Sequence, residues 1–345
     1  MPDELVTDDF LARPPGVPII DVRTPDEFAL GHIRGAVNVP LFSNEERAAI
    51  GTAYTQQGRS PAVSLGLRCV GPRLADLARS LLDLTDPADP LLHIHCWRGG
   101  MRSASVAWLM ETTFGCRVAT LRGGYKGFRR WVLESFAIPR EIRVVAGLTG
   151  SGKTAILQHL SALGECVVDL EQIANHKGSA FGQLGEDAQP TQAQFENDLA
   201  QAWRATAAER PLWIEDESRM IGKRVLPAAL WERKQHARLH VVELPPDERI
   251  RHLCAGYARF SPVQLAACIE AIRPRLGGTR AAAAVAALHC GDFTTACRHI
   301  LTYYDRTYQK CLVLCPPQNI TRHFFPQLEP HMIAAALIGS TRTSP

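Results

Sequence analysis

The chain has 345 residues, of which 46% are hydrophobic and 21% are charged, a composition typical of globular proteins. This length exceeds what one hydrophobic core usually serves, so two domains are expected. The 38 basic and 35 acidic residues leave a net charge of +3. That charge neither indicates nor excludes a nucleic-acid-binding protein, because phosphates respond to a local basic stripe. No apolar run reaches about 18 residues and no secretory signal opens the chain, so we expect a cytoplasmic protein without a membrane span.

The first part of the chain alternates apolar runs with amphipathic segments. Thr24, Pro25 and Glu27 form the signature of a helix start, with Thr24 as N-cap and Glu27 completing a capping box. The expected strands span residues 17–22, 36–39, 91–95 and 116–121, and further helices are expected at 73–84 and 103–110. Strands that alternate with helices predict a parallel α/β sheet.

A second pattern of the same kind begins after a short linker. Residues 123–130 are glycine-rich and basic, and we expect them to precede a helix around 131–136. Residues 138–140 have the composition of a linker, and a new strand is expected at 143–146. The tail is predicted to be helical at 265–272 and 279–288. We therefore expect one domain over residues 1–137 and a second, with a helical C-terminal part, over residues 138–345.

Ten cysteines are scattered along the chain without paired metal-binding spacings, and most are expected to be free thiols of a reducing compartment. Cys96 differs, because it leaves a buried strand and enters a loop with two glycines before a helix. Loop N–H groups and the helix N-terminus favour an anion there. Arg98 and Arg102 add positive charge, so we expect a lowered thiol pKa and a catalytic pair of Cys96 and Arg102. The same residues also fit His-Cys-x5-Arg, the phosphate-binding signature of cysteine phosphatases.

The stretch from Gly147 to Thr154 matches the phosphate-binding loop G-x4-G-K-[ST]. An expected strand precedes it and an expected helix follows it, which is the arrangement that such a loop requires. The predicted phosphate-binding residues are Gly147, Thr149, Gly150, Ser151, Gly152, Lys153 and Thr154. Thr154 is also a candidate Mg²⁺ ligand. ATP or GTP is the usual ligand of this loop, but a pyrophosphate-bearing substrate satisfies the same physical requirements.

An acidic strand end follows about sixty residues later. Glu215, Asp216 and Glu217 are candidates for the carboxylate that orients the metal of a P-loop. Alternation along a strand places Glu215 and Glu217 on one face and Asp216 on the other. Arg219 follows and is a candidate phosphate contact, or else part of a solvated basic face.

The segment from Asp21 to Pro40, with its Asp-x-Arg and Gly-His-Ile-x-Gly-Ala elements, closely resembles the entry motif of rhodanese domains. The resemblance covers roughly residues 13–136. It implies a rhodanese-like parallel-sheet domain in which Asp21 and Arg23 are structural and Cys96 is the nucleophile. The second domain is then a P-loop NTPase-like α/β domain.

Several stretches together resemble the bacterial tRNA 2-selenouridine synthases. They are residues 44–51, 54–58, 95–103, 121–130, 147–154, 169–182 and 213–219, with weaker hints at Tyr303–Tyr308. The resemblance implies a selenotransferase that converts wobble 2-thiouridine of tRNA to 2-selenouridine. It further implies S-geranylation with geranyl diphosphate and selenium transfer from selenophosphate, with Cys96 carrying selenium as a perselenide. The P-loop would then bind the diphosphate of geranyl diphosphate, and an enzyme that supplies selenophosphate is an expected partner.

Basic and aromatic residues interleave in the segment Tyr125–Arg130. Lys126, Arg129 and Arg130 are candidate contacts to the tRNA anticodon loop. The alternative is that the aromatic residues cap the first domain while the basic residues are solvated.

Two other functions fit parts of the pattern. One is a phosphatase-like cysteine domain fused to a small-molecule kinase, which rests on His-Cys-x5-Arg and the P-loop. The other is a sulfur-relay module that nucleotide binding switches. The anion-stabilising loop around Cys96 argues against an inert module.

Overall fold

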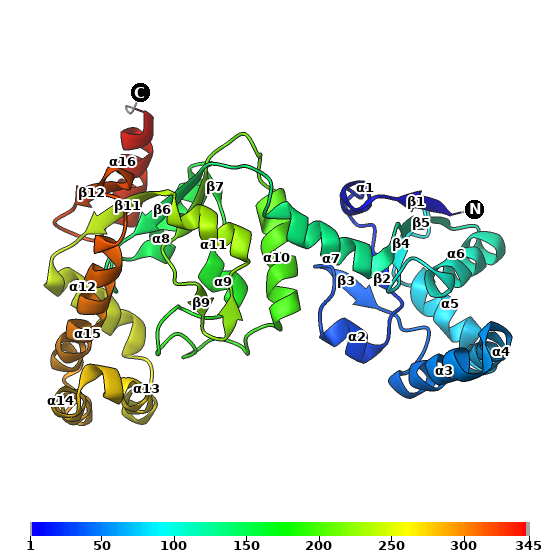
Figure 1. The fold of residues 1–345 in the computed structure, drawn as a ribbon, viewed down its shortest axis with the longest axis horizontal. Helices are drawn as coiled ribbons and strands as arrows, with labels where there is room; N and C mark the ends of the chain where they lie inside the picture. The colour runs from blue at the N-terminus through cyan, green and yellow to red at the C-terminus, as the bar shows by residue number, and fades with distance from the viewer. Residues whose placement is uncertain (1, 343–345) are drawn as a thin grey trace. The chain divides into compact units, whose positions relative to one another are not determined.

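A computed structural model describes residues 2–342 of the chain, which divide into two compact units (Figure 1). The first comprises the residues up to Ser135 together with Glu196–Gln201, and the second comprises Phe136–Phe195 and the chain from Ala202 onward. The sequence-based boundary between residues 137 and 138 falls next to this division. The grouping of Glu196–Gln201 with the first unit has no counterpart in the prediction.

The first unit is built on a five-stranded parallel sheet in the order β1-β5-β4-β2-β3. Its strands are β1 (Asp3–Leu5), β2 (Ile19–Asp21), β3 (Ala36–Asn38), β4 (Leu91–His95) and β5 (Arg117–Leu121). The four expected strands are confirmed, and β1 is an addition. Asp21 and His95 are paired in register at the carboxyl ends of β2 and β4. Cys96 therefore leaves the sheet at the edge where parallel strands of α/β folds present their functional residues.

Among the described residues, the first unit has seven α-helices, and four of them differ from the expectations. They are α1 (Thr7–Leu11), α2 (Pro25–Ala29), α3 (Asn44–Gln57), α4 (Arg59–Val70), α5 (Leu74–Leu82), α6 (Met101–Phe114) and α7 (Gly124–Ser135). The expected capping box of Thr24 and Glu27 is present at α2. Helices α1, α3 and α4 were not predicted. Helix α7 begins at Gly124 instead of near 131, because a single turn at Gly123 and Gly124, both with positive φ, leads directly into it.

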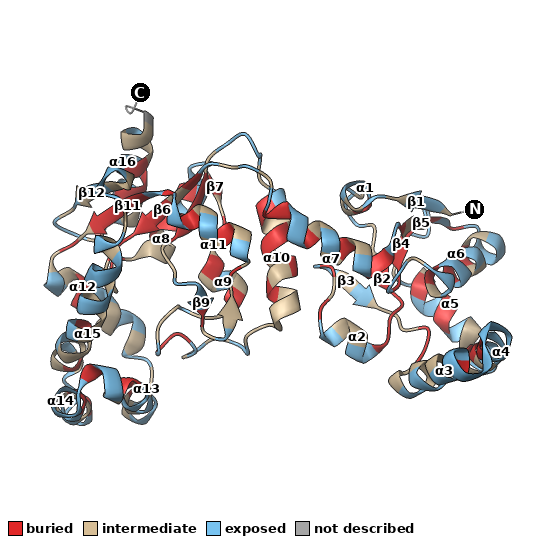
Figure 2. Ribbon diagram, in the orientation of Figure 1, coloured by how far each residue is buried: buried red, intermediate tan, exposed pale blue. Residues whose placement is uncertain are grey.

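The second unit has its own five-stranded parallel sheet, in the order β12-β11-β6-β8-β7. Its strands are β6 (Ile142–Ala146), β7 (Cys166–Val167), β8 (Leu212–Glu215), β11 (Arg238–Glu243) and β12 (Ile320–Phe324). A short antiparallel pair, β9 (Met220–Ile221) and β10 (Arg224–Val225), follows β8. Figure 2 shows β6, β8 and β11 largely buried, as expected for strands that helices cover on both faces, whereas the edge strand β12 has no buried residue.

The helices of the second unit fall into two groups. Those near the sheet are α8 (Lys153–Ala162), α9 (Leu170–Ala174), α11 (Ala228–Gln235) and α16 (Pro330–Arg342). Helix α10 (Gln192–Arg204) is divided, because its residues Glu196–Gln201 group with the first unit. The helical C-terminal part is confirmed as α12 (Pro246–Tyr257), α13 (Pro262–Leu276), α14 (Gly278–His289) and α15 (Phe293–Val313). Helices α13 to α15 bury a cluster of their own that includes Leu265, Ile269 and Leu288. Between residues 2 and 342, no helix combines the length and the apolar composition that crossing a membrane requires.

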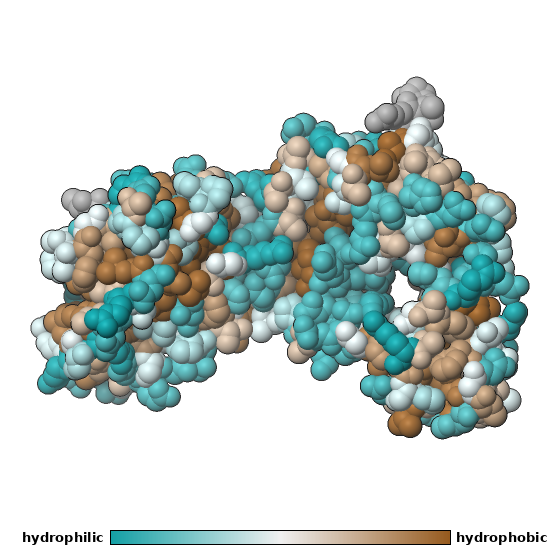
Figure 3. All heavy atoms as spheres, turned by 180° about the vertical axis from the view of Figure 1, so that it is seen from behind, coloured by the Kyte–Doolittle hydropathy of each residue, from teal (hydrophilic) through white to brown (hydrophobic). Residues whose placement is uncertain are grey.

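On the face shown in Figure 3, hydrophilic side chains alternate with apolar patches. Single exposed apolar residues are normal for a folded domain. Trp97 and Met101 differ from these, because both are exposed beside Cys96 among charged residues.

Candidate active sites

Cys96 lies at the end of β4 in a loop that closes around its sulfur. The residue is 3% exposed, and the Ser103 hydroxyl of α6 lies 3.2 Å from its Sγ atom. Burial alone would raise the thiol pKa, but hydrogen bonds from the Ser103 hydroxyl and from the backbone N–H groups of Ser103, Arg98 and Gly100 outweigh it and lower the pKa. The loop is therefore built to hold an anion on or next to this sulfur.

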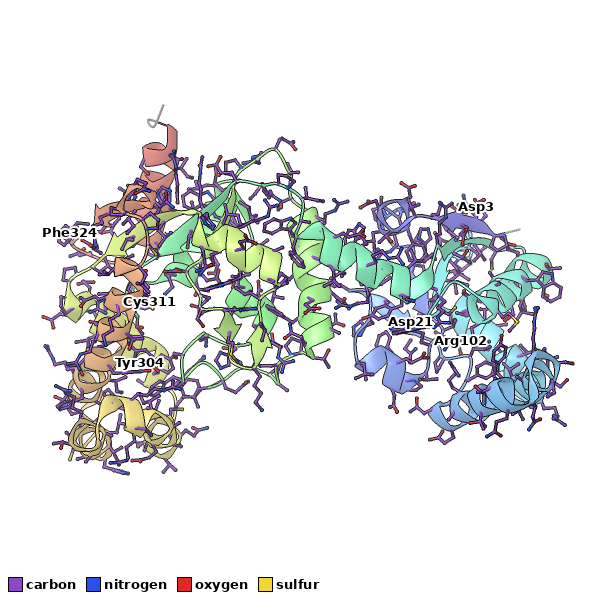
Figure 4. The ribbon with its side chains drawn as sticks, viewed as in Figure 1. Asp3, Asp21, Arg102, Tyr304, Cys311 and Phe324 are labelled. Carbon is purple, nitrogen blue, oxygen red and sulfur yellow. The ribbon has the colours of Figure 1, made fainter. Side chains whose placement is uncertain are left out.

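Arginine charge is not the source of this lowered pKa, which corrects the expectation from the sequence. The Arg102 guanidinium is held by the Glu27 carboxylate, with Nη1–Oε2 at 2.6 Å and Nη2–Oε1 at 3.2 Å. Burial opposes ionisation of Glu27, but the bonds from Arg102 prevail and lower the pKa of this carboxyl. Figure 4 labels Arg102 and Asp21 within this unit. Arg102 remains a predicted catalytic residue. An anion bound at Cys96 would have to bind Arg102 alongside Glu27 or displace Glu27 from it.

The glycine-rich start of α7 is hydrogen-bonded to the backbone of the Cys96 loop. Tyr125 donates its backbone N–H to the Cys96 carbonyl at 2.8 Å, and Lys126 donates to the Trp97 carbonyl at 2.9 Å. Gly124 has φ of +57°, and a Cβ atom there would lie 2.4 Å from the Cys96 carbonyl oxygen. Only glycine permits this approach, so the Gly123–Gly124 turn serves the geometry of the cysteine loop.

A buried ion pair anchors the strand ends beneath the site. The Arg23 guanidinium contacts the Asp21 carboxylate at 2.6 Å and donates to the Gly31 carbonyl at 2.7 Å. His95 Nε2 lies 3.6 Å from Asp21, and burial lowers the pKa of this imidazole, which is therefore neutral at pH 7. These residues fix the strand ends, in agreement with the structural role expected for Asp21 and Arg23.

Above Cys96 the surface is hollowed. The hollow has a volume of about 480 Å³ and is lined by Glu27, Arg47, Cys96, Trp97, Arg98, Gly100, Met101 and Arg102. This size falls within the range of about 300–1,000 Å³ typical of small-ligand sites. The exposed lining of the hollow is mostly apolar, and three arginines and Glu27 stand among the residues around the sulfur.

In the second unit, the P-loop connects β6 to α8 in the predicted way. Gly150 and Gly152 have φ of +87° and +74°, a backbone conformation that glycine adopts without strain. Lys153 Nζ donates to the Gly147 carbonyl at 3.4 Å, and the buried Ser151 hydroxyl has no partner among the described residues. The lysine closes the loop over the space that phosphates occupy in such sites.

Four carboxyl groups gather beside Lys153 and Thr154. Glu215 lies at the end of β8 and is 1% exposed, Glu217 follows it, and Asp169 and Glu171 come from the start of α9. Burial raises the pKa of all four, repulsion from neighbouring carboxylates adds to the rise for Glu171, Glu215 and Glu217, and the pKa of Glu217 rises to about 8. The Thr154 hydroxyl donates to Glu171 at 3.1 Å, and the Glu171 N–H donates to Glu215 at 2.7 Å.

Asp216 points away from this cluster, as strand alternation predicts. Its carboxylate accepts from Lys234 at 2.5 Å and from the Tyr308 hydroxyl at 3.0 Å. The Gly147 N–H in turn donates to the Tyr308 hydroxyl at 2.9 Å. Asp216 is therefore hydrogen-bonded, through Tyr308, to Gly147, the first residue of the P-loop. Because these bonds occupy its carboxylate, Asp216 is a poor candidate for a metal ligand.

The P-loop has a second connection to α15. Arg249 of α12 donates to the Thr149 carbonyl at 3.0 Å and forms two bonds, of 2.9 and 2.7 Å, with the Asp305 carboxylate. Tyr304, labelled in Figure 4, accepts the N–H of Ala180 at 3.3 Å. The Tyr303–Tyr308 segment, whose role the sequence left open, thus holds two loops of this site.

Thr154 and Glu171 are the residues best suited to bind Mg²⁺ in the second unit. Among residues 2–342, no three His, Cys, Asp or Glu side chains converge as a metal site. Mg²⁺ at a P-loop needs few protein ligands, because phosphate oxygens and waters complete its shell. The bonded Thr154–Glu171 pair and the unpartnered Glu215 Oε2 atom supply oxygens for such an ion.

Two of the three predicted RNA contacts are exposed, and the third is held in an ion pair. Lys126 and Arg130 are the exposed residues. Arg129 forms an ion pair with Glu196 and donates to Asn197 at 2.6 Å, so its charge is used within its own unit. Arg219 is exposed in the turn after β8.

Four residues of the two sites escaped the sequence analysis. Ser103 stands next to Arg102, in the first turn of α6, but only the fold aims its hydroxyl at Cys96. Asp169 and Glu171 form an Asp-x-Glu pattern after a short strand, a signal that could have been used. Tyr308 lies 161 residues from its partner Gly147, and no local signal connects them.

A hydrogen-bonded cysteine at the edge of one parallel sheet and a P-loop on a second sheet define a rhodanese-like domain fused to a P-loop domain. The rhodanese-like domain model matches residues 7–130, and the model described as the tRNA 2-selenouridine synthase AAA domain matches residues 140–313. The chain therefore belongs to the tRNA 2-selenouridine synthase family.

Curated relatives carry the same name. The tRNA 2-selenouridine synthase of Shewanella denitrificans is 39% identical over 70% of this chain and 65% of its own length. That of Cupriavidus pinatubonensis is 37% identical over 77% of each chain, and that of Cronobacter sakazakii is 40% identical over 74% of this chain and 67% of its own. A solved domain of a Clostridium difficile 630 protein described as ATP/GTP binding is 36% identical over 38% of this chain and 99% of its own, with a TM-score of 0.35.

Proposed function

We propose that this chain converts wobble 2-thiouridine of tRNA to 2-selenouridine, in two steps that its two units divide. The observation that carries the proposal is an anion-stabilising cysteine loop and a complete P-loop in one chain. The names of the relatives, tRNA 2-selenouridine synthase, support the substrate and the product. The anticodon loop of tRNA and an enzyme that delivers selenophosphate are the corresponding partners.

The P-loop unit is assigned the geranyl transfer. The loop amides and Lys153 bind the diphosphate of geranyl diphosphate, as they would bind nucleotide phosphates. The thiouridine sulfur attacks the first carbon of the geranyl group, the S–C bond forms, and the C–O bond breaks with its electron pair leaving on diphosphate. Mg²⁺ at Thr154 and Glu171 would screen the charge of the leaving group. Neither ATP nor GTP is needed for this step.

The Cys96 unit is assigned the selenium transfer. Cys96 first attacks a small-molecule disulfide, which gives a mixed disulfide on Cys96 and releases one small thiolate. Water hydrolyses the P–Se bond of selenophosphate, phosphate leaves, and the hydroselenide displaces the small thiolate from the Cys96 sulfur, which gives a Cys96 perselenide. The perselenide attacks C2 of the uracil and geranyl thiolate leaves. A small thiol then attacks the Cys96 sulfur, releases 2-selenouridine and restores the mixed disulfide.

The test is mass spectrometry of nucleosides from 2-thiouridine tRNA incubated with the protein, geranyl diphosphate, selenophosphate and a small thiol together with its disulfide. The wild type is expected to produce 2-selenouridine. Cys96→Ala should stop at the geranylated nucleoside, and Lys153→Ala should leave 2-thiouridine unchanged. Unaltered 2-thiouridine with the wild type under every combination would discard the proposal, and hydrolysis of a generic aryl phosphate would then favour the phosphatase–kinase alternative.

A further inference from the structure

We propose that the rim of the Cys96 hollow, formed by Trp97, Arg47 and Arg98, is the binding site for the modified uridine nucleotide, with Trp97 stacking on the base and the two arginines on its flanking phosphates. The inference rests on the proposed function and deepens it. It moves the expected RNA contact from the α7 basic residues to the mouth of the cysteine site.

Trp97 has the exposure and the support that a stacking platform needs. It follows the nucleophile directly and is 37% exposed, although an indole of this size is usually well buried. Its ring packs against Tyr125 at 5.7 Å between centroids and lies 5.9 Å from the Arg23 guanidinium. One side of the indole is thus fixed by the protein, while the exposed part borders the hollow. Bases taken out of a helix stack on such aromatic rings.

The charges around the hollow suit a phosphate backbone. The carboxylate among the lining residues, Glu27, is engaged by Arg102. Across residues 2–342, Arg47 and Arg98 take part in no ion pair, so two guanidinium groups remain for an anionic ligand. Arginine binds phosphate oxygens through two parallel N–H groups. Two arginines that flank an exposed tryptophan match a nucleotide better than they match a small inorganic anion alone.

The buried and the exposed residues of the hollow are assigned different roles. The amides of Arg98, Gly100 and Ser103 surround the Cys96 sulfur at the floor and serve the selenium chemistry. The Trp97 ring and the arginine side chains lie at the rim. Removing a rim side chain should therefore weaken tRNA binding without preventing selenium from reaching Cys96.

The experiment measures three quantities on the full chain: affinity for tRNA by fluorescence anisotropy, KM for geranylated tRNA, and selenium on Cys96 by intact mass spectrometry without tRNA. Trp97→Ala should weaken affinity and raise KM by about tenfold or more, with loading of Cys96 unchanged and partial rescue by Trp97→Phe. Arg47→Ala and Arg98→Ala should weaken binding and each reduce the salt dependence by about one released ion. Trp108→Ala, which removes a 61% exposed tryptophan of α6 outside the hollow, is the matched control, together with Arg68→Ala on α4.

Equal tRNA affinity for wild type and Trp97→Ala would overturn the inference. Loss of Cys96 loading in step with turnover would also overturn it, because Trp97 would then support the cysteine loop only. If the wild type forms no selenouridine, the proposed function fails, but the anisotropy comparison still judges the rim as an RNA site.

Discussion

Hydrogen bonds to the Cys96 sulfur lower the pKa of this thiol, and the charges of the nearby arginines are not among the main causes. Desolvation opposes the thiolate, and the Ser103 hydroxyl with three backbone N–H groups reverses the balance. The Arg102 charge is already matched by Glu27. In this loop, therefore, the donor that points at the sulfur matters more for the thiol than the net charge of the neighbourhood.

Replacing Ser103 by alanine is expected to raise the pKa of Cys96. Hydrogen bonds to charged groups contribute about 1.5–3 kcal/mol, so the pH midpoint of thiol alkylation should rise by about one to two pH units. The measurement is the rate of iodoacetamide reaction against pH, followed at Cys96 by mass spectrometry. Ser105→Ala is the control, because the Ser105 hydroxyl bonds only within α6. An unshifted profile in a folded Ser103→Ala protein would show that the amides alone set the pKa.

The sequence singled out Cys96 as the predicted nucleophile and its loop N–H groups as stabilising an anion, but it did not point to the Ser103 hydroxyl. A cysteine between a buried strand and two glycines is visible from local pattern, and so is a P-loop lysine. Ser103, Glu171 and Tyr308 act through side-chain directions that only the tertiary structure sets. The arginines were overrated because sequence proximity does not show that Glu27, 75 residues earlier, already holds Arg102.

Helix α15 braces the phosphate-binding loop at two points. Tyr308 bonds the Gly147 N–H and Asp216, and Asp305, three residues earlier and so on the same helix face, holds Arg249 against Thr149. Burial raises the pKa of the Tyr308 hydroxyl, which therefore stays protonated and can donate to Asp216 while it accepts from Gly147. The helical C-terminal part is thus coupled to the loop that binds phosphates.

Tyr308→Phe should weaken diphosphate binding while leaving the ring packing in place. A lost hydrogen bond of about 0.5–1.5 kcal/mol corresponds to about a threefold to tenfold higher Kd for inorganic pyrophosphate, measured by calorimetry. Tyr303→Phe on the same helix is the control, because Tyr303 packs in the helical cluster. Equal affinities of the two variants would mean that the loop holds its shape without α15.

The four carboxyl groups beside Lys153 should make the stability of the chain depend on pH. The pKa of Glu217 is about 8 in the folded protein against an ordinary value of 4.5. The folded state then holds more protons than the unfolded state between these values, so the free energy of unfolding falls as pH rises from about 5 to 8.

Glu217→Gln removes one of these protonation sites. The variant is expected to match the wild type near pH 5 and to exceed its stability above pH 8 by on the order of one to several kcal/mol. Calorimetric Tm values of both proteins across this pH range provide the measurement. Glu209→Gln, at an exposed position of the same unit, should follow the wild type. A wild type whose Tm does not fall toward pH 8 would contradict a protonated Glu217.

Elements were predictable wherever the apolar pattern agreed with the turn residues. Strands β4 and β6 and helix α14 fall close to the expected spans. The predicted start of helix α7 was wrong, because Gly123, Gly124 and Gly127 were interpreted as a loop. In the structure, glycine is needed at 124 for close approach to the Cys96 loop and at 127 for close approach to the Arg122 carbonyl. Helices α3 and α4 have weakly amphipathic sequences, so their periodicity gave little signal.

The chain as a whole carries its two candidate sites on separate units, each with its own sheet and core. Neither site borrows a described residue from the other unit: the Cys96 hollow is lined from Glu27 to Arg102, and the P-loop is braced by residues 216 to 308. In the proposed function the two reactions are therefore expected to proceed independently, with the geranylated tRNA as the species that would connect them.

This independence is testable by mixing two defective full-length chains. Cys96→Ala retains the P-loop and Lys153→Ala retains the cysteine loop, so the mixture should form 2-selenouridine although neither variant does so alone. Production should be slower than for the same amount of wild type, because the geranylated tRNA must leave one chain and bind another. Nucleoside mass spectrometry over time measures both, and the double variant Cys96→Ala/Lys153→Ala mixed with either single variant is the control. A mixture that accumulates only the geranylated nucleoside would mean that the intermediate does not pass between chains, and the two sites would then have to act within one molecule.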